Sequence, residues 1–248
     1  MQIVLTFDPA CKVDERTAAF VAAALDAQAA EFCTKWNLPP VPVNYYSTDV
    51  LLGLEGEELA KFTADSYMVT VQTTIDVANA LGYHDDVLGT IFARVLWQVD
   101  ATWATISHEI LELLGDLTCD IYVSKGNGTE QAKEACDRVE EDSYPCVGTI
   151  GDDSMTFALS NYLLLSAFEP NSQGPWDRMG TLKTWDGLTP GGYEIVRDAA
   201  GNETEIDASR ASVRVVPGSE AAHATIAAKR ARSDSRLVRR LAIARAAA

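Results

Sequence analysis

One short segment of the 248-residue chain has residue types and a spacing that suit a metal ion, and its sequence is SHEILELLGD. His108 and Glu112 are four residues apart, which places them one turn apart on the same face of a helix. Glu109 is rotated by roughly 100° from His108 and can address a water molecule beside the ion. A zinc ion lowers the pKa of such a water to about 7, and a nearby carboxylate can then accept its proton. We therefore expect His108 and Glu112 to be zinc ligands and Glu109 to be a general base for amide hydrolysis.

The third ligand is less directly indicated by the sequence. Asp116 lies two turns beyond the histidine, or ~12 Å along a straight helix. It could reach the ion if Gly115 adopted a left-handed conformation and turned the chain back. Asp137 and Glu134 are alternative donors if their segment folds over the helix, and His84 is a further alternative.

A second interpretation of the same helix needs no metal. The side opposite the histidine is apolar, with Trp103, Ile106, Ile110, Leu113 and Leu114. On this interpretation His108, Glu109 and Glu112 form the solvent-exposed face of an amphipathic helix.

Hydrophobic periodicity and breaker residues predict the elements around this helix. We expect helices over residues 13–36, 102–114, 129–141 and from 220 onward, with a helical turn at 57–62. We expect strands over residues 42–46, 67–72 and 90–98, and a hairpin that pairs 193–197 with 212–216. The metal-binding helix should begin at a cap formed by Asp100 or Thr102 and end with Gly115 just beyond it.

Charge is distributed unevenly along the chain, whose net charge is −16. Residues 219–248 contain seven basic and two acidic residues, whereas the rest contains 13 basic and 34 acidic residues. An acidic body disfavours nucleic-acid binding by that part of the chain. The basic C-terminal helix is expected to dock on an acidic surface, either that of its own body or that of a protein partner in a homo-oligomer or virion assembly.

The five cysteines are odd in number and none lies in a CxxC motif. We expect free thiols in a reducing compartment, with a Cys136–Cys146 disulfide as the alternative. The N-terminus lacks the features of a signal peptide, and no segment approaches the ~20 apolar residues that span a bilayer. The sequence therefore favours a cytoplasmic or virion protein without a membrane segment.

Five segments, in order, resemble a family of uncharacterised phage and bacterial proteins that carry a metallopeptidase signature. The matching segments are LDAQAAEFCTKWNLP, LGYHDDVLGTIFARV, SHEILELLGD, EACDRVE and LTPGGY, which together span Ala24 to Tyr193. The resemblance implies an α+β, zincin-like fold in which a mixed β-sheet packs on the active-site helix. It also implies His108 and Glu112 as zinc ligands, Glu109 as general base, and a third acid from Asp116 or from Glu134 and Asp137.

The expected organisation is a zincin-like domain over residues 1–193, a β-hairpin extension over 194–218 and a basic C-terminal helix over 219–248. The leading functional hypothesis is a zinc-dependent, peptidase-like amide hydrolase of phage origin, with an anionic ligand that weakens hydrolysis. The alternative is a virion structural or assembly protein on the same scaffold, which docks through its C-terminal helix.

Overall fold

A five-stranded mixed sheet forms the centre of the computed structural model, which describes residues 1–77, 80–87, 90–99, 102–208 and 214–215. Its strands are β1 (Gln2–Phe7), β2 (Val43–Tyr45), β3 (Ser66–Gln72), β4 (Gly82–Val87) and β5 (Thr90–Leu96). They follow the order β2-β1-β3-β5-β4. Neighbouring strands are parallel except for β4, which is antiparallel to β5 at the edge. The protein is thus of mixed α and β structure, as predicted.

Helices cover both faces of this sheet. Successive side chains of a strand point to opposite faces, and the central strands carry apolar side chains on both, so each face needs a covering layer. The inner set includes Ile3, Val69 and Ala93 and packs in one core with helices α1 (Glu15–Lys35) and α4 (Thr102–Gly115). The outer set, Val4, Met68 and Phe92, packs against Leu51 of α2 (Thr48–Gly53) and Leu59 of α3 (Gly56–Ala64).

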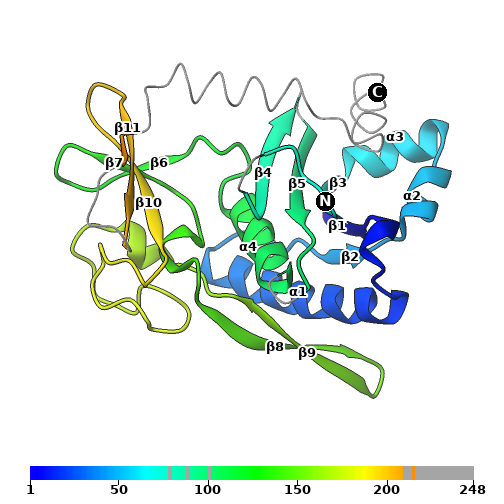
Figure 1. Ribbon diagram of the computed structural model, residues 1–248. Coiled ribbons are helices and arrows are strands. Elements are labelled where there is room, and N and C mark those ends of the chain that lie inside the picture. Colours follow the sequence, from blue (N-terminus) through cyan, green and yellow to red (C-terminus); the bar gives the residue numbers. More distant parts are fainter. Residues whose placement is uncertain (78–79, 88–89, 100–101, 209–213, 216–248) are drawn as a thin grey trace.

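Helix α4 lies between the central sheet and a second sheet (Figure 1). The second sheet is antiparallel, with the order β12-β11-β10-β7-β6. Its strands are β6 (Tyr122–Ser124), β7 (Glu130–Ala132), β10 (Tyr193–Arg197), β11 (Glu203–Asp207) and β12 (Arg214–Val215). Helix α4 packs against α1 and against strands β4, β5 and β9. The helix predicted to bind metal is therefore enclosed on several sides.

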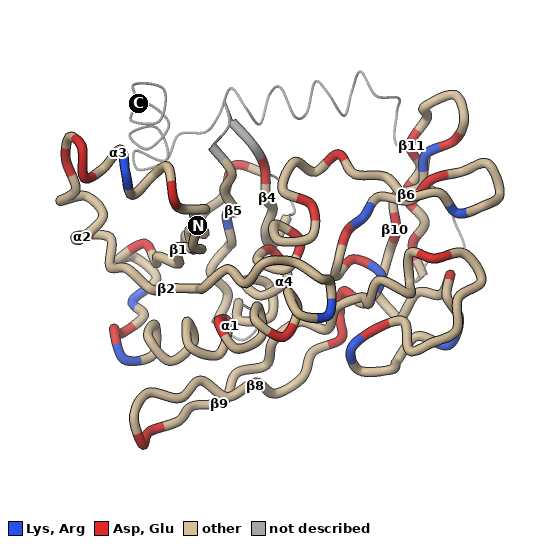
Figure 2. The backbone as a smooth tube through the Cα atoms, turned by 180° about the vertical axis from the view of Figure 1, so that it is seen from behind, with Lys and Arg blue, Asp and Glu red and all other residues tan. Residues whose placement is uncertain are grey.

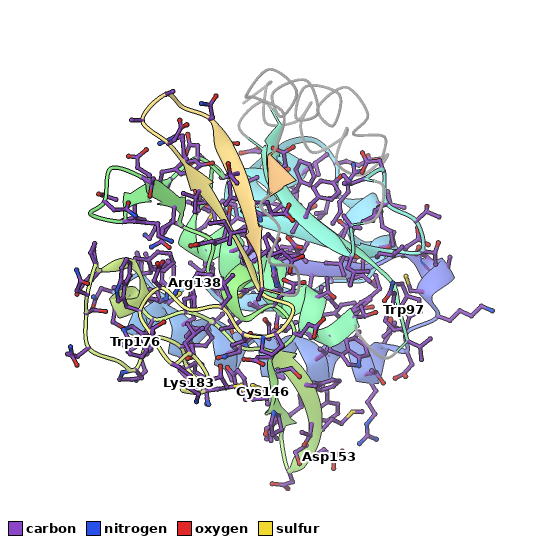
Figure 3. The ribbon with its side chains drawn as sticks, turned by 60° about the vertical axis from the view of Figure 1, so that its left-hand side comes forward. Trp97, Arg138, Cys146, Asp153, Trp176 and Lys183 are labelled. Carbon is purple, nitrogen blue, oxygen red and sulfur yellow. The ribbon has the colours of Figure 1, made fainter. Side chains whose placement is uncertain are left out.

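A long hairpin of β8 (Ser143–Ile150) and β9 (Asp153–Ser160) closes the remaining side of the core. Asp153 lies at its outer end, and Cys146 lies nearer the body (Figure 3). Gly148 permits the hairpin to approach α1, since a Cβ there would lie 2.9 Å from the carbonyl carbon of Phe20. The hairpin is thereby fixed against the helix that supports α4.

Several predicted elements are confirmed: α1, α3, α4, β2, β3 and β5 lie within a few residues of their expected positions. The predicted helix over 129–141 is wrong, because this stretch forms β7 and a 3-10 turn at Asp137–Val139. The predicted hairpin partner of residues 193–197 is also wrong. Strand β10 pairs with β11, and the described residues of 212–216, Arg214–Val215, form β12 on the far side of β11.

Other expectations have mixed outcomes. All five cysteines are free thiols. None of the helices in the described part of the chain is both long and apolar enough to cross a membrane. Acidic residues outnumber basic ones along the described chain (Figure 2). The predicted C-terminal helix over 219–248 lies outside the described residues.

Candidate metal centre

The three polar residues that the sequence predicts as a site are buried in α4. His108, Glu109 and Glu112 retain only 8%, 4% and 5% of their accessible surface. The interpretation of this face as the solvent-exposed side of an amphipathic helix is therefore wrong. Burial of ionisable side chains without compensation is costly, so the surroundings of these three residues need an explanation.

His108 lies between acidic side chains at both ring nitrogens. Its Nε2 is 3.1 Å from Glu112 Oε2 and 3.4 Å from Asp137 Oδ1. Its Nδ1 is 3.1 Å from Glu140 Oε2, although the direction of approach is not that of a hydrogen bond. In this arrangement Nε2 is the atom that faces the site.

Glu112 is oriented by the main chain of the segment that covers α4. The backbone N–H of Cys136 donates a hydrogen bond to Glu112 Oε1, at 3.3 Å. This contact leaves Oε2 directed toward His108. The Cys136 thiol is buried at the same place, and His108, Glu112 and Cys136 offer ligand atoms within 4.8 Å of one another.

The segment that carries Asp137 is held in place by its neighbour Arg138 (Figure 3). The buried guanidinium donates hydrogen bonds to the carbonyl oxygens of Ala167 at 3.0 Å and of Gly187 at 2.9 Å. These contacts tie residues 137–140 to the 3-10 helix Leu165–Phe168 and to the loop at Gly187. They hold the segment that presents Asp137 and Glu140 to His108.

Strand β4 brings His84 to the same place. His84 is in register with Ala93 of β5, so its side chain lies on the inner face, toward α4. Its Nδ1 is 3.6 Å from Glu109 Oε2 and 3.8 Å from Glu112 Oε2. Gly82 lets the helix come this close, since a Cβ there would lie 2.8 Å from Glu109 Cγ.

The structure places the candidate third ligands differently. Asp137 forms a group of potential ligands with His108 and Glu140, and His84 forms another with Glu109 and Glu112. Glu134 is nearby, with a buried Oε2 that has no hydrogen-bond partner in the described structure.

Asp116 instead serves the turn after α4. Its carboxylate accepts hydrogen bonds from the backbone N–H of Thr118 at 3.2 Å and of Ile121 at 2.8 Å. The expected left-handed Gly115 is wrong, because this glycine is the last residue of the helix and has no positive φ. The left-handed residue is Cys119, with φ 54°. The turn therefore comes later than predicted, and it uses both oxygens of Asp116.

The electrostatics reflect the crowding of acids. Burial lowers the pKa of His108, but Glu112 and Glu140 outweigh this and raise it well above its usual value. Burial and the neighbouring Asp137 raise the pKa of Glu112 well above normal. Burial also raises the pKa of Glu134 to about 7, with Asp137 as a further cause. In the absence of a cation, the cluster is thus expected to retain protons.

Two residues of the site were not predicted from the sequence. One is Glu140, described above. The other is Tyr193, whose phenol contacts Asp137; burial and this acid raise the pKa of the phenol well above its usual value. Gly192 allows the contact, because a Cβ there would lie 2.7 Å from the carbonyl carbon of Arg138. The two glycines before the tyrosine were the available signal, since they indicate a close approach of main chains.

Comparisons with protein-family models, with curated proteins and with solved structures give no match for this chain. Imidazole and carboxylate donors are typical zinc ligands. Buried carboxylate oxygens without hydrogen-bond partners in the described structure, such as Glu109 Oε2 and Glu134 Oε2, are also consistent with a site for a cation. The donor set fits a divalent metal ion.

Proposed function

We propose that the protein is a zinc-dependent amide hydrolase with a zincin-like fold. In this proposal His108, Glu112 and Asp137 hold the ion. The observation that carries the proposal is the position of His108 Nε2, buried 3.1 Å from one carboxylate and 3.4 Å from another. Such separations suit atoms that share an ion, because zinc ligands in a tetrahedral site lie roughly 3.4 Å apart.

The arrangement of the elements supports the same class. The zincin-like resemblance implies a mixed sheet packed on a helix that carries His-Glu-x-x-Glu. Helix α4 carries this motif and packs against β4 and β5 of a mixed sheet. Fold alone does not define an activity, so the functional proposal depends on the side chains.

A zinc ion at this position would supply Lewis acidity, lowering the pKa of a water molecule to about 7 and polarising a carbonyl group. Glu109 is the residue proposed to accept the proton of the attacking water. Its Oε2 is buried and has no hydrogen-bond partner in the described structure. It projects from the same helix as the two ligands, one residue after His108.

Tyr193 is proposed to assist at the carbonyl oxygen of the substrate. The pKa of its phenol lies above the usual value of about 10, so the phenol is protonated at neutral pH. A protonated phenol can donate a hydrogen bond to an oxygen that gains negative charge, which stabilises the transition state.

The two acidic ligands also set an expectation for rate. Glu112 and Asp137 are anionic and neutralise more of the ion's charge than neutral imidazoles do. We therefore expect slower amide hydrolysis than at a site built from histidines. This agrees with the weakened hydrolytic activity that the sequence suggests.

The metal part of the proposal is tested by elemental analysis of the purified protein after dialysis against zinc. Wild type should retain zinc, and His108→Ala should lose the most tightly bound equivalent. His223→Ala, which removes the third histidine of the chain and leaves α4 intact, is the matched control and should behave as wild type. Equal, negligible zinc in wild type and His108→Ala would overturn the proposal.

The catalytic part is tested separately on a panel of peptide substrates. Glu109→Gln should reduce turnover by at least 100-fold, in line with the usual contribution of a general base. The variant should still bind zinc through His108. Undiminished turnover in Glu109→Gln would contradict the role assigned to this residue.

A further inference from the structure

The buried cluster offers more ligand atoms than one zinc ion requires. Among the described residues, three groups have potential ligand atoms within 4.8 Å of one another. Two of them contain His108, joined either with Glu112 and Cys136 or with Asp137 and Glu140. The third contains His84, Glu109 and Glu112. Glu112 is the residue that the His84 group shares with a His108 group.

The two histidines belong to different groups. His84 and His108 do not occur together in any of the three groups, and Glu112 is the residue common to a group of each. Each imidazole is therefore placed to serve a different ion.

The spacing inside the His84 group is that of ligands around an ion. His84 Nδ1 lies 3.6 Å from Glu109 Oε2 and 3.8 Å from Glu112 Oε2. These separations are too long for hydrogen bonds. They are close to the roughly 3.4 Å expected between two ligands of a tetrahedral zinc ion. The geometry thus leaves room for a cation where direct contacts are missing.

Unpartnered polar atoms provide an independent observation. The side chains of His84 and Glu109 are only 7% and 6% exposed. Glu109 Oε2, which lies 3.6 Å from His84 Nδ1, is nevertheless buried without a hydrogen-bond partner in the described structure. Such atoms cost free energy unless something compensates them.

The balance of charge in the cluster also favours a second cation. The cluster contains five carboxylates, Glu109, Glu112, Glu134, Asp137 and Glu140, which face the two imidazoles. With neutral imidazoles and ionised acids, one divalent cation would leave a net charge of −3, and two would leave −1. Buried like charges disfavour ionisation of one another, so a second cation would stabilise the fully ionised cluster.

We propose that the centre binds two divalent cations bridged by Glu112, the first at His108 and Asp137 and the second at His84 and Glu109. This inference rests on the proposed function, because it extends the same centre. A cation in the second position uses the Glu109 carboxylate as a ligand. The protein with both ions then lacks its proposed base, so the second ion acts as an inhibitor.

The test is a zinc titration of the full chain after removal of metal with a chelator, followed by elemental analysis at saturation. Wild type should bind two equivalents, and His84→Ala should bind one. His223→Ala is the matched control for adventitious binding and should bind two. Glu109→Gln is a second variant for the same position and should weaken the second equivalent while leaving the first.

The outcomes separate this inference from the proposed function. A single equivalent in wild type would overturn the second cation and leave the proposed function intact. Two equivalents in both wild type and His84→Ala would overturn the assignment to His84. No bound zinc in wild type would overturn both proposals.

Discussion

At the scale of single residues, the surroundings of His108 determine how metal binding depends on pH. Neighbouring acids outweigh burial and raise the pKa of the imidazole, so it is protonated near pH 7 in the metal-free protein. Zinc binds only the neutral ring. Zinc binding should therefore release at least about one proton. The affinity for zinc should also fall about tenfold for each unit of pH below the pKa of His108.

Isothermal titration in two buffers that differ in ionisation enthalpy measures this release. The observed heat at pH 7 should differ between the buffers in proportion to the protons released. Identical heats would show that the imidazole is already neutral, contrary to the electrostatics of the cluster.

Glu134 gives a prediction about stability in the absence of metal. Its pKa is raised from 4.5 to about 7 in the folded protein. A raised pKa contributes stability that is fully present below about pH 4.5 and is lost as the pH rises through about 7. Glu134→Gln has no carboxyl group to titrate at this position and should not show this loss of stability. With chelator present, the variant should match wild type near pH 4.5 and melt several °C higher at pH 8 (roughly 2–4 °C per kcal/mol).

Thermal unfolding followed by circular dichroism at the two pH values checks this expectation. Saturating zinc provides the control, because a cation compensates the carboxylate and should reduce the gain. A variant that melts below wild type at pH 8 in chelator would be inconsistent with an uncompensated acid at this position.

At the scale of elements, the closeness of β4 and α4 is what brings His84 to the helix. Gly82→Ala places a Cβ 2.8 Å from Glu109 Cγ, so the Glu109 side chain or one of the two elements must shift. Overpacking of this kind typically costs about 1–3 kcal/mol. The matched control is Gly53→Ala in α2, where nothing lies within 4 Å of the added atom and φ is not positive.

Urea unfolding should show a loss of stability for Gly82→Ala and little change or a slight gain for Gly53→Ala. Zinc titration should also show a weaker second equivalent in Gly82→Ala. Wild-type stability and unchanged zinc binding in this variant would mean that β4 and α4 do not need their close contact.

Elements with a clear hydrophobic periodicity could be predicted from the sequence. Helix α1 could be predicted because apolar residues such as Phe20 and Leu25 recur at helical spacing, and α4 because its apolar side does the same. Strand β1 has five consecutive buried residues, Ile3 to Phe7, and so lacks the alternation of a half-buried strand. The β8–β9 hairpin was missed because it is locally mixed in polarity and is fixed by its contact with α1.

The residues of the site could likewise be predicted only where local spacing determines their position. Helical spacing alone predicted that His108 and Glu112 share a face. The neighbours of His108 across the cluster depend on how residues 124–153 fold back over α4, and that path is set by tertiary contacts such as those of Arg138. Asp137, Glu140 and Tyr193 could therefore not be ranked by spacing along the chain.

At the scale of the whole molecule, the acidic body and the basic C-terminal segment are expected to act independently. All residues of the proposed centre lie between His84 and Tyr193. A chain that ends at Gly218 should therefore bind as many equivalents of zinc as the full chain, although its net charge changes from −16 to −21. Elemental analysis and size-exclusion chromatography of the two forms check this prediction. A folded truncated chain that fails to bind zinc would show that residues 219–248 contribute to the centre.

The central claim is that a metal ion lies beside His108, and anomalous diffraction from crystals grown with zinc tests it most directly. Data collected on both sides of the zinc absorption edge should show a peak within about 2.3 Å of His108 Nε2, Glu112 Oε2 and Asp137 Oδ1. Crystals soaked in excess zinc with no peak at this position, and with His108 still paired directly to the two acids, would contradict the account.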